Sequence, residues 1–138
     1  MSSRNLDRIC ARFGFQIARQ VNAAFGKPSD TENLITKSLG VLQESGVYAF
    51  FLYLASQVRE GSDERKASKA VRTLADGAAG LLVHDPPALL KSGDLKRAME
   101  EIRQPNGLAD NLDNLLLAKR LLEQAMIYAR YHAKVLGE

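Results

Sequence analysis

The sequence is poor in the residues from which disulfide frameworks and metal sites are built. Its 138 residues include a single cysteine, Cys10, and only two histidines, His84 and His132. One cysteine excludes an intramolecular disulfide and a cysteine-rich zinc site. Neither histidine has another histidine three or four residues away, which excludes the helical pair that commonly binds a metal. We therefore expect no metal and no other cofactor.

Long apolar runs are also missing. The longest, Val47–Ala55, has nine residues, far short of the roughly 20 that are needed to span a bilayer. Charged residues near the N-terminus, Arg4, Asp7 and Arg8, interrupt any apolar core of a signal peptide. We therefore expect a cytoplasmic protein that does not enter a membrane.

No set of residues typical of catalysis can be assembled from the sequence. The segment Gly77-Ala-Ala-Gly80 is followed by Leu81 and Leu82, whereas a phosphate-binding loop would continue with Lys and Ser or Thr. We interpret its small residues as allowing two helices to approach closely. Cys10 falls on the apolar face of its helix, which predicts a buried and unreactive thiol. We expect a protein that is not an enzyme and has no small-molecule substrate.

What the sequence does contain is a series of helix-forming segments separated by short turns. We expect one domain over residues 1–138, with Val47–Leu54 as its most buried helix. Apolar spacing and capping residues predict where the helices lie. The first covers Ser3–Phe25, and the second opens with a Ser29-x-x-Glu32 capping box and runs through Leu42. The others are Val47–Leu54, Ser62–Val83, a short helix after Asp85-Pro86, Asp94–Arg103 and about Asp110–Leu136. The predicted fold is an all-α, compact single-domain bundle of six or seven helices.

Charge is distributed unevenly along the chain, whose net charge is +3. Residues 1–27 carry five basic side chains and one acidic one, a net charge of +4, and residues 115–137 carry +3. The segment 28–114 has ten basic and thirteen acidic residues, a net charge of −3, and Glu138 adds one more negative charge. Two basic helices therefore flank an acidic middle.

Basic residues recur at helical spacing in three places. The first helix carries four arginines within about 80° of its circumference, opposite its apolar face: Arg4, Arg8, Arg12 and Arg19. Phe15 lies inside the same arc. In the last helix, three cations share an arc of about 60° with Glu123: Lys119, Arg130 and Lys134. A third, shorter row lies in the middle of the chain: Arg65, Lys69 and Arg72.

These rows are candidates for a nucleic-acid interface. Cationic groups at one-turn spacing can contact successive phosphates. A solvated helix face with ordinary Lys and Arg content is the alternative interpretation. An apolar ring on a basic face can contact a partner subunit or stack on a base. We interpret Phe15 as a contact with a partner subunit in preference to a stacking ring.

Three segments carry a resemblance to a known family. The first is the Arg-rich first helix with interleaved apolar residues, Arg8-Ile9-x-Ala11 followed by Ile17. The second is Leu39-x-Val41-Leu42-Gln43-Glu44-Ser45-Gly46-Val47, with Phe50-Phe51-Leu52 after it, and the third is the last helix from Leu115 to Lys134, with aromatic residues near a basic one. Together with length and helical character, they resemble the small subunit of the type III-B CRISPR RNA-guided effector, the Cmr complex. The family commonly has Trp in the last helix, where Tyr128 or Tyr131 would take its place here.

The resemblance implies a non-catalytic subunit whose copies stack along the effector complex, beside the backbone subunits that hold the guide RNA. Its basic helix faces would line the channel for target RNA, and RNA cleavage would belong to other subunits. The small subunit of the type III-A (Csm) complex is also small, helical and basic, so the subtype stays open. The alternative function is a helical adaptor outside CRISPR, whose basic faces bind acidic protein partners.

Overall fold

The computed structural model describes residues 3–58, 65–85 and 87–137. Within these ranges the chain forms six α-helices, one short 3-10 helix and no strand. The elements are α1 Ser3–Phe25, α2 Pro28–Ser45, α3 Val47–Gln57, α4 Arg65–Val83, α5 Leu95–Arg103, the 3-10 helix η1 Leu108–Asp110, and α6 Leu112–Leu136. The prediction of an all-α helical bundle is confirmed.

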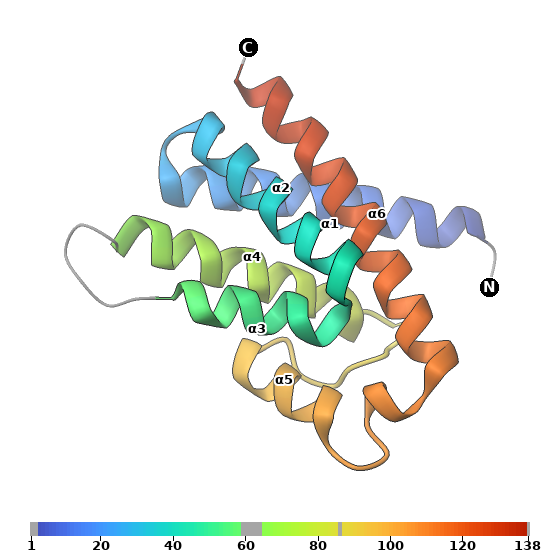
Figure 1. Cartoon of the computed structure of the whole chain (residues 1–138). Coiled ribbons are helices and arrows are strands. Elements are labelled where there is room, and N and C mark those ends of the chain that lie inside the picture. The colour runs from blue at the N-terminus through green and yellow to red at the C-terminus, as the bar shows by residue number, and fades with distance from the viewer. Residues whose placement is uncertain (1–2, 59–64, 86, 138) are drawn as a thin grey trace.

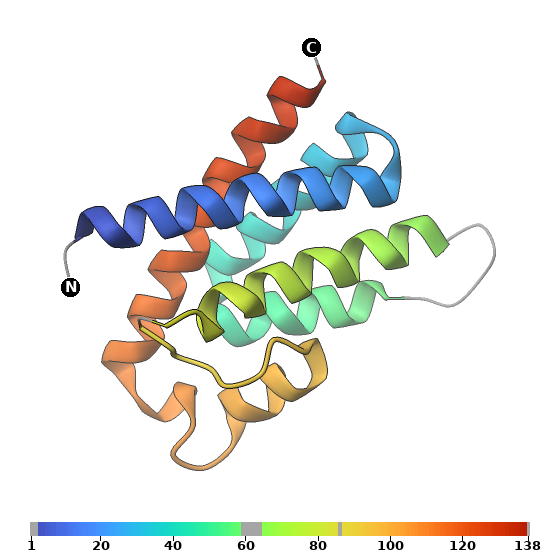
Figure 2. The ribbon, with the colours of Figure 1, turned by 180° about the vertical axis from the view of Figure 1, so that it is seen from behind.

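The bundle is organised around the two end helices (Figure 1). Helix α1 packs against α6 along one flank and against α4 along another, and α2 runs beside α6. Helix α3 contacts α2, α4 and α5, while η1 joins α5 to the start of α6. Seen from the opposite side, α1 is the outermost helix and α6 crosses behind it (Figure 2). Two helices 86 residues apart in sequence therefore meet directly.

One hydrophobic core joins the helices, and α3 contributes its largest side chains. Phe50 and Phe51 are fully buried and meet edge to face, with their ring centroids 5.1 Å apart. Val47 and Leu54 are buried beside them, whereas Leu52 stays 49% exposed. The prediction that this segment forms a core helix is confirmed, with Leu52 as the position that points outward.

Glycine permits two of the closest helix contacts. A Cβ at Gly14 of α1 would lie 2.6 Å from the carbonyl oxygen of Ala125 and 2.7 Å from the Cβ of Tyr128 in α6. A Cβ at Gly77 of α4 would lie 2.7 Å from the Cγ1 of Ile17 in α1. Such distances are shorter than packed carbon atoms tolerate. The packing role predicted for the small residues at 77–80 is confirmed at Gly77.

The capping box predicted at Ser29 is wrong. Helix α2 begins at Pro28, and Lys27 is its N-cap without a side-chain hydrogen bond. Proline suits the first helical position because its missing N–H would have no partner there. Ser29 consequently lies inside the first turn of α2. The cap predicted at Ser62 and the turn at 60–62 fall outside the described residues.

The short helix predicted after Asp85-Pro86 is also wrong. The described part of this segment, residues 87–94, forms no helix. The carbonyl of Leu82 accepts hydrogen bonds from the N–H groups of both Leu89 and Leu90. The carboxylate of Glu101 accepts two more, from the N–H groups of Lys91 and Ser92 at 2.8 and 2.9 Å. The backbone of this connection is thus satisfied by α4 and α5 instead of by a helix of its own.

The later helix boundaries agree with the sequence except for one cap. The side chain of Asp94 accepts a hydrogen bond from the N–H of Arg97, which confirms the cap predicted for α5. Asn111 caps α6 by accepting the N–H of Asn114, whereas Asp110 accepts the N–H of Asn106 in the preceding turn. Among the described residues, no helix combines the length and the apolar character that crossing a membrane requires.

Candidate nucleic-acid interface

The outer face of α1 presents a row of cationic side chains to solvent. Arg8, Arg12 and Arg19 are all exposed, and Phe15 between them is 47% exposed. The opposite side of the helix is buried at Cys10, Gly14, Ile17, Ala18 and Val21. Because α6 and α4 cover those flanks, the arginine row is the side that remains open (Figure 2). The packing of α1 therefore determines which of its faces a partner can reach.

The arginines of this row keep their charge available for a partner. In the described part of the chain, Arg8, Arg12 and Arg19 form no ion pair. The acid described on α1, Asp7, accepts a hydrogen bond of 2.6 Å from the hydroxyl of Tyr128 in α6. The guanidinium carbon of Arg12 lies 5.6 Å from the centroid of the Phe13 ring. The result is a positively charged surface without local neutralisation.

Helix α4 extends this surface at one point. Lys69 is exposed and lines a shallow depression between α4 and α1 together with Gln20 and Ala23. Ala23 lies one turn beyond Arg19 on α1, and Asp76 of α4 lines the same depression as Lys69. Arg72 faces a different depression, which it lines with residues of α3 and α5. The side chains of Arg4 and Arg65 are outside the described part of the structure.

The basic row of α6 lies on the flank that packs against α2. The Nζ of Lys119 is 3.3 Å from the carbonyl oxygen of Gln43 and 3.9 Å from a carboxylate oxygen of Glu123. The Nζ of Lys134 is 3.9 Å from a carboxylate oxygen of Glu32 in α2. Arg130 is partly buried, and its Nε has no hydrogen-bond partner. Lys119 and Lys134 are therefore held against α2 and do not continue the row of α1.

Two aromatic side chains, Phe15 of α1 and Tyr131 of α6, are exposed. The ring of Phe15 meets the ring of His132 edge to face, with centroids 5.2 Å apart. Tyr131, the residue before His132, is 62% exposed, and the Nζ of Lys134 lies 5.8 Å from its ring centroid. The arc containing Phe15 was visible in the sequence, but its contact with His132 was not. A contact between residues 117 positions apart leaves no local pattern.

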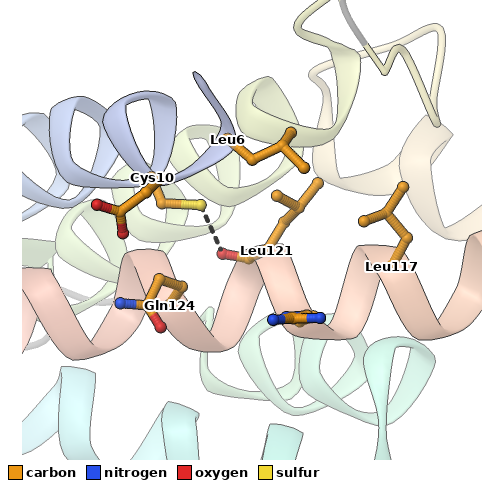
Figure 3. A pocket seen from close by; sticks show the side chains of 7 residues that line it. Leu6, Cys10, Leu117, Leu121 and Gln124 are labelled. Atoms are coloured by element: carbon orange, nitrogen blue, oxygen red, sulfur yellow. Dashed lines mark hydrogen bonds between the residues drawn. The ribbon is translucent and has the colours of Figure 1, made fainter. Parts of the chain in front are cut away.

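A pocket of about 500 Å³ lies beside this interface, between the N-terminal part of α1 and the middle of α6 (Figure 3). Leu117 and Leu121 point from α6 toward Leu6 of α1, while Asp7 and Arg120 supply charged groups at the pocket. The thiol of Cys10 donates to the carbonyl oxygen of Leu121 at 3.5 Å. Apolar and charged groups thus line the same pocket.

The chemistry of Cys10 follows from its burial. Burial, with a smaller contribution from the nearby charge of Asp7, raises the pKa of the Cys10 thiol to about 11. The group therefore stays protonated at neutral pH, and a protonated thiol is a poor nucleophile. The prediction that Cys10 is buried is confirmed, and its raised pKa accounts for the low reactivity that was expected of it.

The sequence analysis did not single out Asp76. Burial and the nearby Asp94 raise the pKa of the Asp76 carboxyl, while Arg72 and the N–H of Leu95 act in the opposite direction. The carboxyl of Asp76 in α4 thus lies at the N-terminus of α5, where Asp94 is the capping residue. Only the packing of α4 on α5 brings these two carboxyl groups together.

This pair predicts a dependence of stability on pH. The pKa of Asp76 is raised in the folded state, so protonation of this carboxyl stabilises the folded protein. Its contribution to the free energy of unfolding is complete below the usual pKa of 3.8 and is lost as pH rises through the folded-state pKa. Asp76→Asn cannot ionise, and its amide oxygen can still accept the N–H of Leu95. We expect the variant to gain stability relative to the wild type as pH rises from 3 to 7, measured by urea unfolding. Asp85→Asn, an exposed acid outside the helices, is the control, and a gain that does not change with pH would contradict the prediction.

Comparisons with known proteins found no match: no family model, no curated protein and no solved structure matches this chain. Among the described residues, no group of three or more His, Cys, Asp or Glu side chains is arranged to hold a metal ion. The arginine face of α1 therefore offers the best-defined basis for a function.

Proposed function

We propose that this protein is a non-catalytic, RNA-contacting subunit of a type III CRISPR RNA-guided effector complex. The single observation that carries the RNA contact is the open row of Arg8, Arg12 and Arg19 on α1, which has no acidic partner among the described residues. The assignment to this class of complex, and to the type III-B form in particular, rests on the resemblance of the three sequence segments.

The spacing of the row suits a phosphate backbone. Arg8 and Arg12 are separated by about 6 Å along the helix axis, and Arg12 and Arg19 by about 10 Å. Guanidinium groups bind phosphate through paired hydrogen bonds, and several of them along one line position a strand without selecting its sequence. Lys69, in the depression that α4 forms with Gln20 and Ala23 of α1, is a fourth exposed cation on this side of the bundle. The proposed contact is therefore indifferent to base sequence.

The other cations have a smaller role in this proposal. Lys119 and Lys134 already have oxygen partners in α2 or α6, and a phosphate would have to compete with those partners. We assign the contact with target RNA first to α1 and Lys69. The remaining surfaces would contact other subunits of the effector and further copies of this chain.

A second candidate function is favoured by the exposed apolar side chains near the C-terminal end of α6. Tyr131, Val135 and Leu136 are 62%, 67% and 43% exposed, and such side chains are common in protein contacts. A protein adaptor would use them, with Phe15 as an anchor, and would bring acidic partners to the basic faces. Size-exclusion chromatography with candidate partner subunits, with and without RNA, distinguishes this function from the first.

The proposal predicts a strong dependence of RNA binding on salt. Each phosphate contact to a single strand contributes about −0.7 to the slope of log K against log salt concentration. Three or four contacts therefore give a slope of about −2 to −3. The measurement is filter binding of a 12-nucleotide single-stranded RNA between 50 and 300 mM salt, with the isolated chain and with the assembled complex. A slope near zero in both samples would overturn the proposal.

A further inference from the structure

We propose that the exposed ring of Phe15, where α1 crosses α6, stacks on an RNA base and that Tyr131 of α6 offers a second stacking ring, a base-stacking platform that makes the RNA site selective for single strands with unpaired bases. This inference rests on the proposed function, because the arginine row must first bring a strand to the surface. It goes beyond that function by assigning the exposed rings to the bases and the cations to the phosphates.

Phe15 has a fixed and accessible ring. Half of its surface is open to solvent, and its edge-to-face contact with His132 restricts how the ring can turn. Core packing does not account for its position, because the buried side of α1 lies opposite. A ring that is already held in place loses little conformational freedom when a base stacks on it.

In contrast to the partner-subunit contact expected from the sequence, the surroundings of Phe15 favour a nucleic acid as the occupant. Arg12 lies three residues before it and Arg19 four residues after it, on the same arc of α1. An apolar protein surface seated on this ring would remove those guanidinium groups from water without supplying negative charge. A nucleic acid strand supplies both a flat apolar face and phosphates that pair with the cations. Charge complementarity therefore selects the strand.

Tyr131 provides a second ring of the same kind. It precedes His132 in α6, and the Nζ of Lys134 lies 5.8 Å from its centroid. Tyr131 is 62% exposed, and its ring leaves α6 about 100° around the helix from His132, the ring that Phe15 touches. Phe15 has Arg12 and Arg19 on its own arc of α1. The Nζ of Lys134 beside Tyr131, in contrast, also lies 3.9 Å from the Glu32 carboxylate, so the cations available to phosphate are mainly those of α1.

A duplex cannot use such a platform. Its bases are paired and stacked on one another, and an A-form helix offers proteins mainly its phosphates, hydroxyls and groove edges. The arginine row alone would bind single and double strands alike. The rings therefore add affinity only for strands whose bases are free, and the selectivity disappears when the rings are removed.

The test compares variants of the full chain on a 12-nucleotide single-stranded RNA and on the same sequence as a duplex. Phe15→Ala and Phe15→Leu are each expected to weaken single-strand binding by about 5- to 150-fold and to leave duplex binding unchanged. Phe15→Trp is expected to keep the wild-type affinity, because an indole also stacks. Tyr131→Ala is expected to behave like Phe15→Ala. Leu52→Ala, at a residue of α3 with 49% exposure, is the matched control and should change neither affinity.

The outcomes separate this inference from the proposed function. If Phe15→Leu binds single strands as well as the wild type, or if Phe15→Ala weakens single and double strands equally, the stacking platform is wrong while RNA binding stands. If the ring variants lose the association with partner subunits and keep RNA affinity, the rings form a protein contact and the inference is wrong. If the wild-type chain and the assembled complex bind no RNA, the proposed function fails and the inference fails with it. Circular dichroism of each variant confirms that the helices are retained.

Discussion

Replacing Arg8, Arg12 and Arg19 together with glutamate is expected to weaken RNA binding by at least about 100-fold. Each substitution removes a charge-assisted hydrogen bond to phosphate, whose typical contribution is about 1.5–3 kcal/mol, and places a like charge beside the strand. The slope of log K against log salt concentration should also become shallower by about 2, because three phosphate contacts are lost. All three side chains are exposed, so the helix content of the variant, measured by circular dichroism, should stay unchanged.

The control for this variant carries the same change in net charge at another place. Lys96, Arg97 and Arg103 are exposed on α5, which lies at the end of the bundle away from α1 (Figure 2). Reversing these three residues to glutamate should reduce RNA affinity far less than the α1 reversal. Equal losses in the two triple variants would show that binding follows net charge alone, and the α1 row would then have no special role.

Replacing Gly14 with alanine is expected to destabilise the protein by about 1–3 kcal/mol. The added methyl group would lie 2.6 Å from the carbonyl oxygen of Ala125 and 3.0 Å from the backbone nitrogen of Ala129. Backbone atoms cannot turn aside as a side chain can, so α1 and α6 must separate. Alanine has the higher helix propensity by about 1 kcal/mol, and this gain should be smaller than the cost of separating the helices. Urea unfolding measures the difference as a lower transition midpoint.

Gly40→Ala is the matched control for this prediction. Gly40 also lies inside a helix, α2, but a Cβ there would meet no atom within 4 Å. The same substitution should therefore stabilise the protein by up to about 1 kcal/mol, because only helix propensity changes. If Gly14→Ala and Gly40→Ala had the same urea transition midpoint, the close contact at Gly14 would have no energetic consequence. The crossing of α1 and α6 would then tolerate a wider spacing.

The helices themselves were largely predictable because their signals are local. Gly46 separates α2 from α3 with a φ of 94°, a conformation that residues with a Cβ rarely adopt. Asp94 caps α5, and the helix expected over about residues 3–25 is found as α1. Each of these features depends on atoms within a few positions of one another. The printed sequence contains all of them.

Two predictions about helix starts were wrong, one because of distant groups and one because of the neighbouring residue. Asp85-Pro86 resembles the start of a helix, yet Leu82 and Glu101 accept the backbone N–H groups that such a helix would have used internally. Ser29 resembles a cap, yet Pro28 already occupies the first helical position. In the first case, the partners lie up to ten residues away in sequence, and nothing in the local pattern identifies them.

The candidate site divides in the same way. The arc of α1 that carries Arg8, Arg12 and Arg19 is open in the structure, as its position opposite the apolar face implied. The row of α6 looked equivalent in the sequence, but the structure places Lys119 and Lys134 against oxygen atoms of α2 or α6. Helical periodicity defines which residues share a face. It does not say which neighbouring helix covers that face.

The sequence by itself determined the helical class of this protein, most of its helix boundaries, the basic character of its end helices and the burial of Cys10. These properties depend on residue type and on spacing within one or two turns. Only the tertiary structure decided that α6 crosses α1 at Gly14, that Phe15 meets His132, and that α1 alone among the end helices keeps its basic row free of oxygen partners in the described chain. The physical reason is that the contacts of Gly14 and Phe15 with α6 join residues more than 100 positions apart, and that the packing of whole helices decides which side chains meet.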